Sequence, residues 1–230
     1  MLARPPRGLY LECWSATHIT RVIRRRPKVS HVARLRDLDI TVLIPVKSPV
    51  NGKSRLNLTP AERQDASWAL VENTVQHLAS LEPILLVNDV GTSAWLEPLG
   101  RPRWIVEGSG LNHTVTEAYR RCRSRWVLVV HSDLAHPELM IDLEVDTVAT
   151  IWPDQHGSGT PLFLLPSGLD WVFAYGPRSR HAHEAALGAA GVPFNVREGS
   201  LAAVDIDTSA DYRAWRQRLM EGAEAPSINP

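Results

Sequence analysis

The chain has 230 residues, of which 44% are hydrophobic and 22% charged, a composition typical of soluble globular proteins. Its two cysteines, Cys13 and Cys122, exclude a disulfide framework, and their spacing fits no metal finger, which favours a reducing cytoplasm. No apolar run approaches the ~20 residues of a membrane span. Residues 1–20 lack the unbroken apolar region of a secretory signal, so neither a membrane nor an export role is expected.

The formal net charge of zero conceals an asymmetry along the chain. Residues 1–36 carry nine Lys/Arg and one acid, Glu12, whereas the remainder carries 16 Lys/Arg and 24 Asp/Glu. An acidic body with embedded cations suits a metal-dependent phosphate enzyme better than a nucleic-acid binder. We expect residues 1–38 to form a flexible basic extension rather than an arm for RNA or a membrane. Residues 39–220 are expected to form a single domain, and residues 221–230 a frayed tail.

Strands and helices alternate along the predicted domain. Residues Ile40–Val46 are nearly all apolar, as expected of a strand that is covered on both faces. Thr59-Pro60-Ala61-Glu62 is a capping box that starts the first helix. Further strands are expected at Ile84–Asn88, Trp104–Glu107, Trp126–Val130, Thr147–Trp152, Leu162–Leu165, Trp171–Tyr175, Pro193–Val196 and Ala202–Ile206, and further helices at Ser93–Leu99, from Asn112, at Ser179–Ala190 and at Ser209–Met220. This order predicts an α/β fold, with a mostly parallel, doubly wound sheet between two helical layers.

The residues that follow the strands are the first candidates for a site, because ligands bind at the carboxyl ends of the strands in such sheets. The loop after the first strand holds Lys47, Lys53 and Arg55 around a glycine. It is not a P-loop, because Lys47 stands where that motif requires its first glycine. Later strands lead into Asn88-Asp89, into the turn from Glu107 to Asn112 with Gly108, Gly110 and Leu111, and into His131-Ser132-Asp133.

Two further acids lie near the end of the domain. Asp205 and Asp207 alternate with Val204 and Ile206, so a strand here would direct both carboxylates to one face. Two residues of strand rise are ~6.6–6.8 Å, which lets two carboxylates flank one cation or hold one each of a pair. Carboxylates that hold Mg²⁺, together with lysines that face phosphate oxygens, describe a site for a nucleoside triphosphate.

Two segments rich in small residues are candidates for binding an anion. Residues 154–160 (DQHGSGT) can form a nest of backbone N–H groups, the alternative being a plain glycine-rich turn. Residues 175–179 (YGPRS) lead into a helix N-terminus, which attracts anions, although Ser179 can instead be simply an N-cap. The histidines at positions 131, 156, 181 and 183 are not expected to form a zinc or acid–base site, because their positions do not converge.

This ordered set of motifs resembles the 2-phospho-L-lactate or phosphoenolpyruvate guanylyltransferase family of coenzyme F-420 biosynthesis. The matching pieces are IPVKSPVNGKSRL with LTPAER, VNDV, GSGLN, the SDL of HSDLAH, DQHGSGT, FAYGPRS and VDIDTSADY, which cover about residues 40–215. The resemblance implies a nucleotidyltransferase fold of the glycosyltransferase-A-like type, in agreement with the order of the elements. The basic leader lies outside it.

The resemblance also implies a role for each matching residue. Asp133, Asp205 and Asp207 would be the Mg²⁺ ligands. The catalytic residues over the GTP phosphates would be Lys47, Lys53 and Arg55, and the remaining nucleotide-binding residues would be Asn88, Asp89, Gly108, Gly110, Leu111 and Asn112. The acceptor phosphate would contact Thr160, Gly176 and Ser179.

The implied reaction transfers GMP from GTP to 2-phospho-L-lactate, phosphoenolpyruvate or 3-phosphoglycerate and releases pyrophosphate. Besides these substrates, a second copy of the chain and a downstream transferase of the F-420 pathway are partners that the resemblance allows. Two alternatives stay open: a divergent nucleotidyltransferase with another nucleotide or acceptor, and a non-catalytic nucleotide-binding paralog. They stay open because His131-Ser132-Asp133 replaces the usual Pro-Ala-Asp, and because Pro161 replaces the usual Asn.

Overall fold

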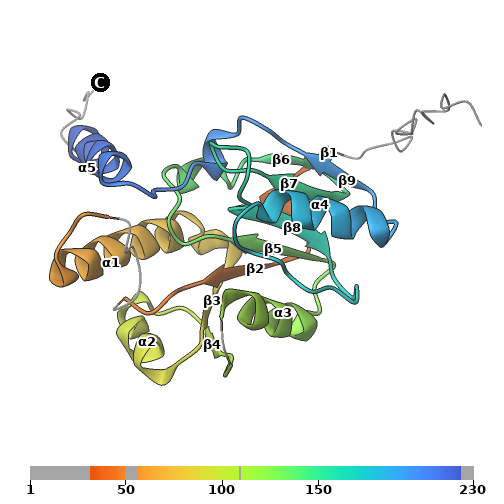
Figure 1. The fold of residues 1–230 in the computed structure, drawn as a ribbon, viewed down its shortest axis with the longest axis horizontal. Helices are drawn as coiled ribbons and strands as arrows, with labels where there is room; N and C mark the ends of the chain where they lie inside the picture. Colours follow the sequence, from red (N-terminus) through yellow and green to blue (C-terminus); the bar gives the residue numbers. More distant parts are fainter. Residues whose placement is uncertain (1–31, 50–55, 109, 224–230) are drawn as a thin grey trace, which may run out of the picture.

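The computed structural model describes residues 32–49, 56–108 and 110–223 (Figure 1). Within this part of the chain, seven strands form one mixed sheet in the order β4-β3-β2-β5-β8-β7-β9. Their bounds are β4 Arg103–Ile105, β3 Ile84–Val87, β2 Ile40–Pro45, β5 Trp126–Val130, β8 Leu162–Pro166, β7 Ala149–Trp152 and β9 Phe194–Val196. Neighbouring strands are parallel except at β8, which runs antiparallel to both β5 and β7. The predicted mostly parallel α/β sheet is confirmed.

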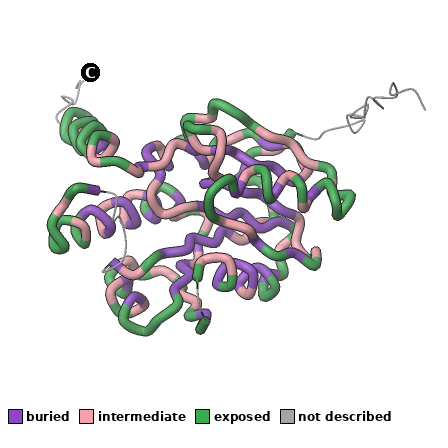
Figure 2. Tube along the Cα trace, viewed as in Figure 1, coloured by how far each residue is buried: buried purple, intermediate pink, exposed green. Residues whose placement is uncertain are grey.

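Helices cover both faces of the sheet, which gives the predicted three layers. Successive side chains of a strand point to opposite faces, so β2 contributes to two separate cores. Ile44 belongs to the same buried cluster as Val75 of α1 (Pro60–His77), a cluster that also contains the end of α2 (Val90–Trp95). Leu43 belongs to the cluster that contains Val115 of α3 (Leu111–Arg121) and Leu187 of α4 (Ser179–Ala189). Figure 2 shows buried residues concentrated along the strands between these helices.

The first helix begins as its sequence predicts. The Thr59 hydroxyl accepts a hydrogen bond from the Glu62 N–H, and the Glu62 carboxylate accepts one from the Thr59 N–H at 2.8 Å. This reciprocal pair satisfies two donors that a helix start leaves open. Helix α2 begins earlier than predicted, at Val90 instead of Ser93, because Asp89 caps it.

The folded domain begins before the predicted boundary between residues 38 and 39. Strand β1 (Val32–Arg34) pairs antiparallel with β6 (Glu144–Asp146) in a separate two-stranded sheet. The following turn buries Leu35 completely in the same core as Ile44. The predicted extension over residues 1–38 is therefore wrong for residues 32–38, and residues 1–31 lie outside the described part. At the other end, α5 (Ser209–Ala223) continues past the predicted limit at residue 220.

Two predicted strands are absent from the described structure. Residues 202–206 contain the end of a short 3-10 helix, η5 (Leu201–Ala203), followed by a single β-bridge at Asp205. Residues 171–175 form no strand because their N–H groups bond to side chains of α3 and α4, as described below. No helix among the described residues is both long enough and apolar enough to cross a lipid bilayer.

Candidate active site

The candidate site lies at the edge of the sheet where β2, β3, β5 and β7 end. β2 is parallel to both β3 and β5, and β7 has the same direction as β5 because both run antiparallel to β8. The carboxyl ends of these four strands therefore share one edge. The strand β5 is completely buried and leads directly into His131-Ser132-Asp133. The edge that the sequence predicted for the site is therefore the one at which Asp133 lies.

Backbone pairing brings Asp133 and Asp205 together. Leu134 and Asp205 form an antiparallel bridge, the Ile206 N–H donates to the Asp133 carbonyl at 2.9 Å, and the Ala135 N–H donates to the Val204 carbonyl at 2.8 Å. Val204 and Ile206 both pack into a small core with Trp215 of α5. The alternation inferred for these residues holds locally, although they form one bridge and not a strand.

The carboxylate of Asp205 lies in a strongly acidic environment. Burial raises the pKa of this carboxyl from 3.8 to about 7, and the charges of Asp133, Asp207 and Asp154 act in the same direction. Among the described residues, the buried Asp205 Oδ1 has no hydrogen-bond partner. A buried carboxylate surrounded by other acids is stabilised by a cation.

These residues fit a divalent cation, because Mg²⁺ prefers hard carboxylate oxygens. However, the described residues contain no group of three His, Cys, Asp or Glu side chains that could together hold one metal ion. The set of Asp133, Asp205 and Asp207 is therefore not preformed as a complete cage. Magnesium sites in phosphate enzymes commonly use one or two carboxylates, with substrate phosphates and waters as the remaining ligands.

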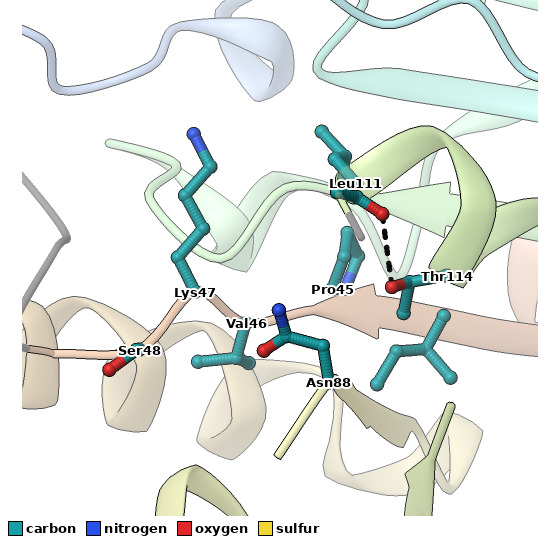
Figure 3. A pocket seen from close by; sticks show the side chains of 9 residues that line it. Pro45, Val46, Lys47, Ser48, Asn88, Leu111 and Thr114 are labelled. Carbon is teal, nitrogen blue, oxygen red and sulfur yellow. Dashed lines mark hydrogen bonds between the residues drawn. The ribbon is translucent and has the colours of Figure 1, made fainter. Parts of the chain in front are cut away.

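A cavity of about 240 Å³ opens beside the end of β2 (Figure 3). It is lined by Pro45, Val46, Lys47, Ser48, Leu86, Asn88, Gly110, Leu111 and Thr114. Figure 3 shows Leu111 and Thr114 reaching it from the start of α3, where the Thr114 hydroxyl donates to the Gly110 carbonyl at 3.1 Å. Lys47 is exposed at the rim, so the cavity combines apolar walls with one described cation.

The predicted nucleotide-binding residues separate into two groups. Lys47, Asn88, Gly110 and Leu111 line the cavity. Asp89, Gly108 and Asn112 are not among its lining residues, and each has a structural contact that accounts for its presence. Lys53 and Arg55 lie outside the described residues.

The carboxylate of Asp89 serves as the N-cap of α2. It accepts hydrogen bonds from both the N–H and the hydroxyl of Thr92, each at 2.7 Å, which lowers its pKa. Gly108 is required by a close approach: its φ is +133°, and a Cβ there would lie 2.4 Å from the His113 ring. That ring bonds the Glu107 carbonyl at 3.0 Å and thereby fixes the turn.

The loop 154–160 does not present an open anion nest, so that part of the sequence interpretation is wrong. The Asp154 carboxylate accepts hydrogen bonds from the N–H groups of Ser158 and Gly159, both at 2.8 Å. The chain thus supplies its own anion to these amides. Gly159 is needed here, because a Cβ would lie 2.5 Å from the Asp154 Oδ2.

The three predicted acceptor residues lie around the start of α4. Thr160 and Ser179 are buried, and the Ser179 hydroxyl donates to the Thr160 Oγ1 at 3.2 Å. The Gly176 carbonyl accepts a hydrogen bond from the Ser179 N–H at 3.1 Å. Arg178, not Ser179, is the N-cap, in a left-handed conformation with a φ of 60°.

The segment Trp171–Tyr175 is held between α3 and α4 by side chains. On one side, the Phe173 N–H donates to the Thr116 Oγ1 at 3.1 Å, and the Tyr175 N–H donates to the Asn112 Oδ1 at 2.6 Å. Asn112 also donates to the Tyr175 carbonyl at 3.0 Å. On the other side, the Ala174 N–H donates to the His183 Nε2 at 3.0 Å. The segment thus connects the helix at the cavity with the helix that carries the predicted acceptor residue Ser179.

Sequence reasoning missed three residues of this site: Asp154, Gln155 and His183. The glycines of residues 154–160 indicate a backbone nest, and this pattern carries no signal for the roles of the Asp154 and Gln155 side chains. His183 carried one usable signal, because it lies four residues after Ser179 and therefore on the same helix face.

Fold and site together define the class of the protein, which is an enzyme of the nucleotidyltransferase type with a glycosyltransferase-A-like fold. A family model described as guanylyl transferase CofC-like matches residues 40–225, and the chain belongs to this family. This match confirms the family that the motifs suggested. A comparison with curated proteins gave no significant match.

Solved structures resemble the chain at low sequence identity. A protein from Desulfovibrio desulfuricans G20, assigned as a nucleotide-diphospho-sugar transferase, has a TM-score of 0.54 and 15% identity, over 83% of this chain and 90% of its own. The 4-diphosphocytidyl-2C-methyl-D-erythritol synthase of Anaerococcus prevotii has a TM-score of 0.44 and 13% identity, over 79% and 98%. The first likeness shows the shared fold and nothing about substrates.

Proposed function

We propose that this enzyme transfers GMP from GTP to a small phosphorylated carboxylic acid and releases pyrophosphate, as a step of coenzyme F-420 biosynthesis. The candidate acceptors are 2-phospho-L-lactate, phosphoenolpyruvate and 3-phosphoglycerate. The observation that carries the proposal is the pairing of Leu134 with Asp205, which brings two acidic segments together at the end of β5. The family match supports the guanylyl group.

The proposed nucleotide site combines the cavity with the acidic cluster. Asn88, Gly110 and Leu111 would bind the nucleoside, while Lys47, Lys53 and Arg55 would neutralise the phosphate charges. Asp133, Asp205 and Asp207 would hold Mg²⁺, which when bound supplies Lewis-acid stabilisation of the phosphate oxygens. Because of their structural contacts, Asp89, Gly108 and Asn112 are assigned to shaping this site.

The proposed reaction requires no protein nucleophile. An oxygen of the acceptor phosphate attacks the α-phosphorus of GTP, a new P–O bond forms, and the bond to the β-phosphate oxygen breaks in line. The chain contributes by positioning and by charge neutralisation, as is usual for phosphoryl-group chemistry. Thr160, Gly176 and Ser179 would hold the acid so that its phosphate faces the α-phosphorus.

Cysteine usage and the family resemblance together support three further proposals. The enzyme would act in the cytoplasm, form a homodimer, and pass its product to a downstream transferase. Each can be examined separately from catalysis, for instance by light scattering for the oligomeric state.

The test is a panel of the four ribonucleoside triphosphates against the three acids with Mg²⁺, read out as pyrophosphate release with product masses. We expect turnover with GTP. Asp205→Asn should lower it by at least about 100-fold, whereas Asp170→Asn, at a fully exposed side chain, should not. Near-normal turnover of Asp205→Asn would contradict the metal assignment. Turnover with another nucleotide or acid alone would favour a different nucleotidyltransferase, and nucleotide binding without any release would favour the non-catalytic paralog.

A further inference from the structure

His183 lies beside the three positions proposed for the acceptor, Thr160, Gly176 and Ser179. It is completely buried on α4, one turn after Ser179. Its Nε2 accepts the Ala174 N–H at 3.0 Å, and its Nδ1 lies 3.2 Å from the Thr160 Oγ1. Ala174 in turn lies two residues before Gly176. The ring therefore contacts Thr160 directly, reaches Ser179 through Thr160, and holds the segment that leads to Gly176 through Ala174.

The hydrogen bonds of His183 determine its tautomer. A backbone N–H can only donate, so the Nε2 that accepts from Ala174 carries no proton. In a neutral imidazole the single proton is then on Nδ1, where it is donated to Thr160. Burial lowers the pKa of His183 to about 4, so the ring is neutral at physiological pH.

This tautomer in turn orients the Thr160 hydroxyl. A hydroxyl oxygen has two lone pairs and one proton. Two donors, His183 Nδ1–H and the Ser179 hydroxyl, both at 3.2 Å, occupy the two lone pairs of the Thr160 Oγ1. The proton of Thr160 is thereby directed to a third partner, and an anion is the natural recipient of such a donor.

The ring of His183 is also held in place by packing. Phe163 and Tyr175 lie with their ring centroids 4.8 and 5.0 Å from it, and Phe173 lies at 6.1 Å. These aromatic contacts would accommodate a phenylalanine of similar size. A phenylalanine at this position would therefore keep the packing and remove both ring nitrogens, which separates the two roles.

We propose that His183 is a positioning residue for the acceptor acid. Its Nδ1–H turns the Thr160 hydroxyl proton toward the phosphate or carboxylate of the acid, and its Nε2 holds the segment that leads to Gly176. This inference rests on the proposed function, because the contacts of Thr160 and Gly176 with the acid belong to that proposal.

Three substitutions separate the two ring nitrogens from packing. His183→Asn places an amide near the Nδ1 position and keeps a donor for Thr160. His183→Gln reaches the Nε2 position and keeps an acceptor for Ala174. His183→Phe fills the aromatic pocket but offers neither a donor to Thr160 nor an acceptor to Ala174. Thermal unfolding shows which variants fold.

Steady-state kinetics of pyrophosphate release then give the decisive comparison. We expect His183→Gln and His183→Phe to raise the KM for the acid at least about tenfold while the KM for the nucleotide changes less than about twofold. His183→Asn should recover most of the affinity for the acid. Equal behaviour of the Asn and Gln variants, or parallel changes in both KM values, would overturn the inference and leave the proposed function intact.

A second measurement covers the case in which a variant does not fold. Nitrogen-15 NMR of the wild-type imidazole should show the Nδ1–H tautomer of His183, and a buried Nε2–H tautomer would overturn the inference. Absence of pyrophosphate release by the wild-type protein with every triphosphate and acid would overturn both the proposed function and this inference.

Discussion

The side chain of Gln155 bonds both polar groups of the Asp205 main chain. Its Oε1 accepts from the Asp205 N–H and its Nε2 donates to the Asp205 carbonyl, each at 3.2 Å. The loop between β7 and β8 thus holds the acidic segment in place beside the end of β5.

Removal of this amide should impair catalysis more than stability. Gln155 is exposed, so the two hydrogen bonds lost in Gln155→Ala exchange with water at a net cost of no more than about 0.5 kcal/mol each, and Asp205 also loses an interaction that lowers its pKa. We expect turnover to fall about tenfold, measured as pyrophosphate release, with a small change in the unfolding temperature. Gln217→Ala is the matched control, because this exposed amide bonds Glu221 within α5. Equal activity of the two variants would refute the role of Gln155.

Asp205 should make the metal-free protein less stable as the pH rises. Its folded pKa of about 7 lies above the unfolded value near 3.8, so the folded state binds this proton more tightly. The contribution of Asp205 to stability therefore falls between about pH 4 and about pH 7. With a chelator, Asp205→Asn should be about 1–4 kcal/mol more stable than the wild type at about pH 8, and similar near pH 4. Urea denaturation over this range measures the difference, and a pH-independent difference contradicts the prediction.

His183 should produce a pH dependence of the opposite sign. Burial, followed by the charge of His131, lowers its pKa from 6.5 to about 4, so the unfolded chain binds this proton more tightly. The stabilisation is complete above about pH 6.5 and is lost as the pH falls toward 4. In an Asp205→Asn background, stability should therefore decrease with acidification over this range, and His183→Phe should flatten the curve. His181→Phe, at an exposed position of the same helix, should leave the slope unchanged.

Two glycine substitutions should have opposite effects on stability. In Gly159→Ala the new Cβ would lie 2.5 Å from the Asp154 Oδ2, so the loop must shift, at a cost of about 1–3 kcal/mol and with loss of turnover. Gly188→Ala, in the last turn of α4 with no atom within 4 Å of the new Cβ, should gain up to about 1 kcal/mol. Chemical denaturation of both variants tests the pair. A destabilised Gly188→Ala would show that α4 tolerates no added methyl group.

Asp89 provides a test of a capping role against a nucleotide-binding role. Loss of the cap in Asp89→Ala should reduce stability by about 0.5–2 kcal/mol, while Asp89→Ser, which keeps a capping oxygen, should retain most of it. The KM for the nucleotide should be unchanged in both variants. A raised KM for the nucleotide at unchanged stability would contradict the capping role and would indicate that Asp89 binds the nucleotide.

Sequence reasoning predicted the fold best where local chemistry and burial agree. The runs at β2 and β5 are buried on both faces, and the capping box at Thr59 fixes the start of α1 regardless of its surroundings. It failed at Trp171–Tyr175, where an apolar pattern suggested a strand. Whether such a segment joins a sheet depends on its hydrogen-bond partners, and here these are side chains from distant parts of the chain.

The site was predictable only in part, for a related reason. The rule that ligands bind at strand ends drew attention to Asp133, which lies just after β5, and the apolar alternation at Val204 and Ile206 indicated where the second acidic segment packs. In the loop 154–160 the Asp154 carboxylate bonds the N–H groups of the same loop, and His183 bonds residues of two other segments. Such hydrogen bonds depend on how the loops and helices pack. No periodicity in the sequence encodes these contacts.

The reversal of β8 has a consequence for how this enzyme can diversify. Because β7 and β8 are antiparallel neighbours, the connection between them is a hairpin tip, and no crossover helix is needed. Changes in residues 153–161 can therefore leave the register of β5 against β8 in place, but they retain turnover only if the contacts of Gln155 with Asp205 and of Asp154 with Ser158 and Gly159 are kept. Because Thr160 at the end of this tip is a proposed acceptor contact, grafted tips that keep those contacts are a direct test of whether the tip sets the selectivity for the second substrate.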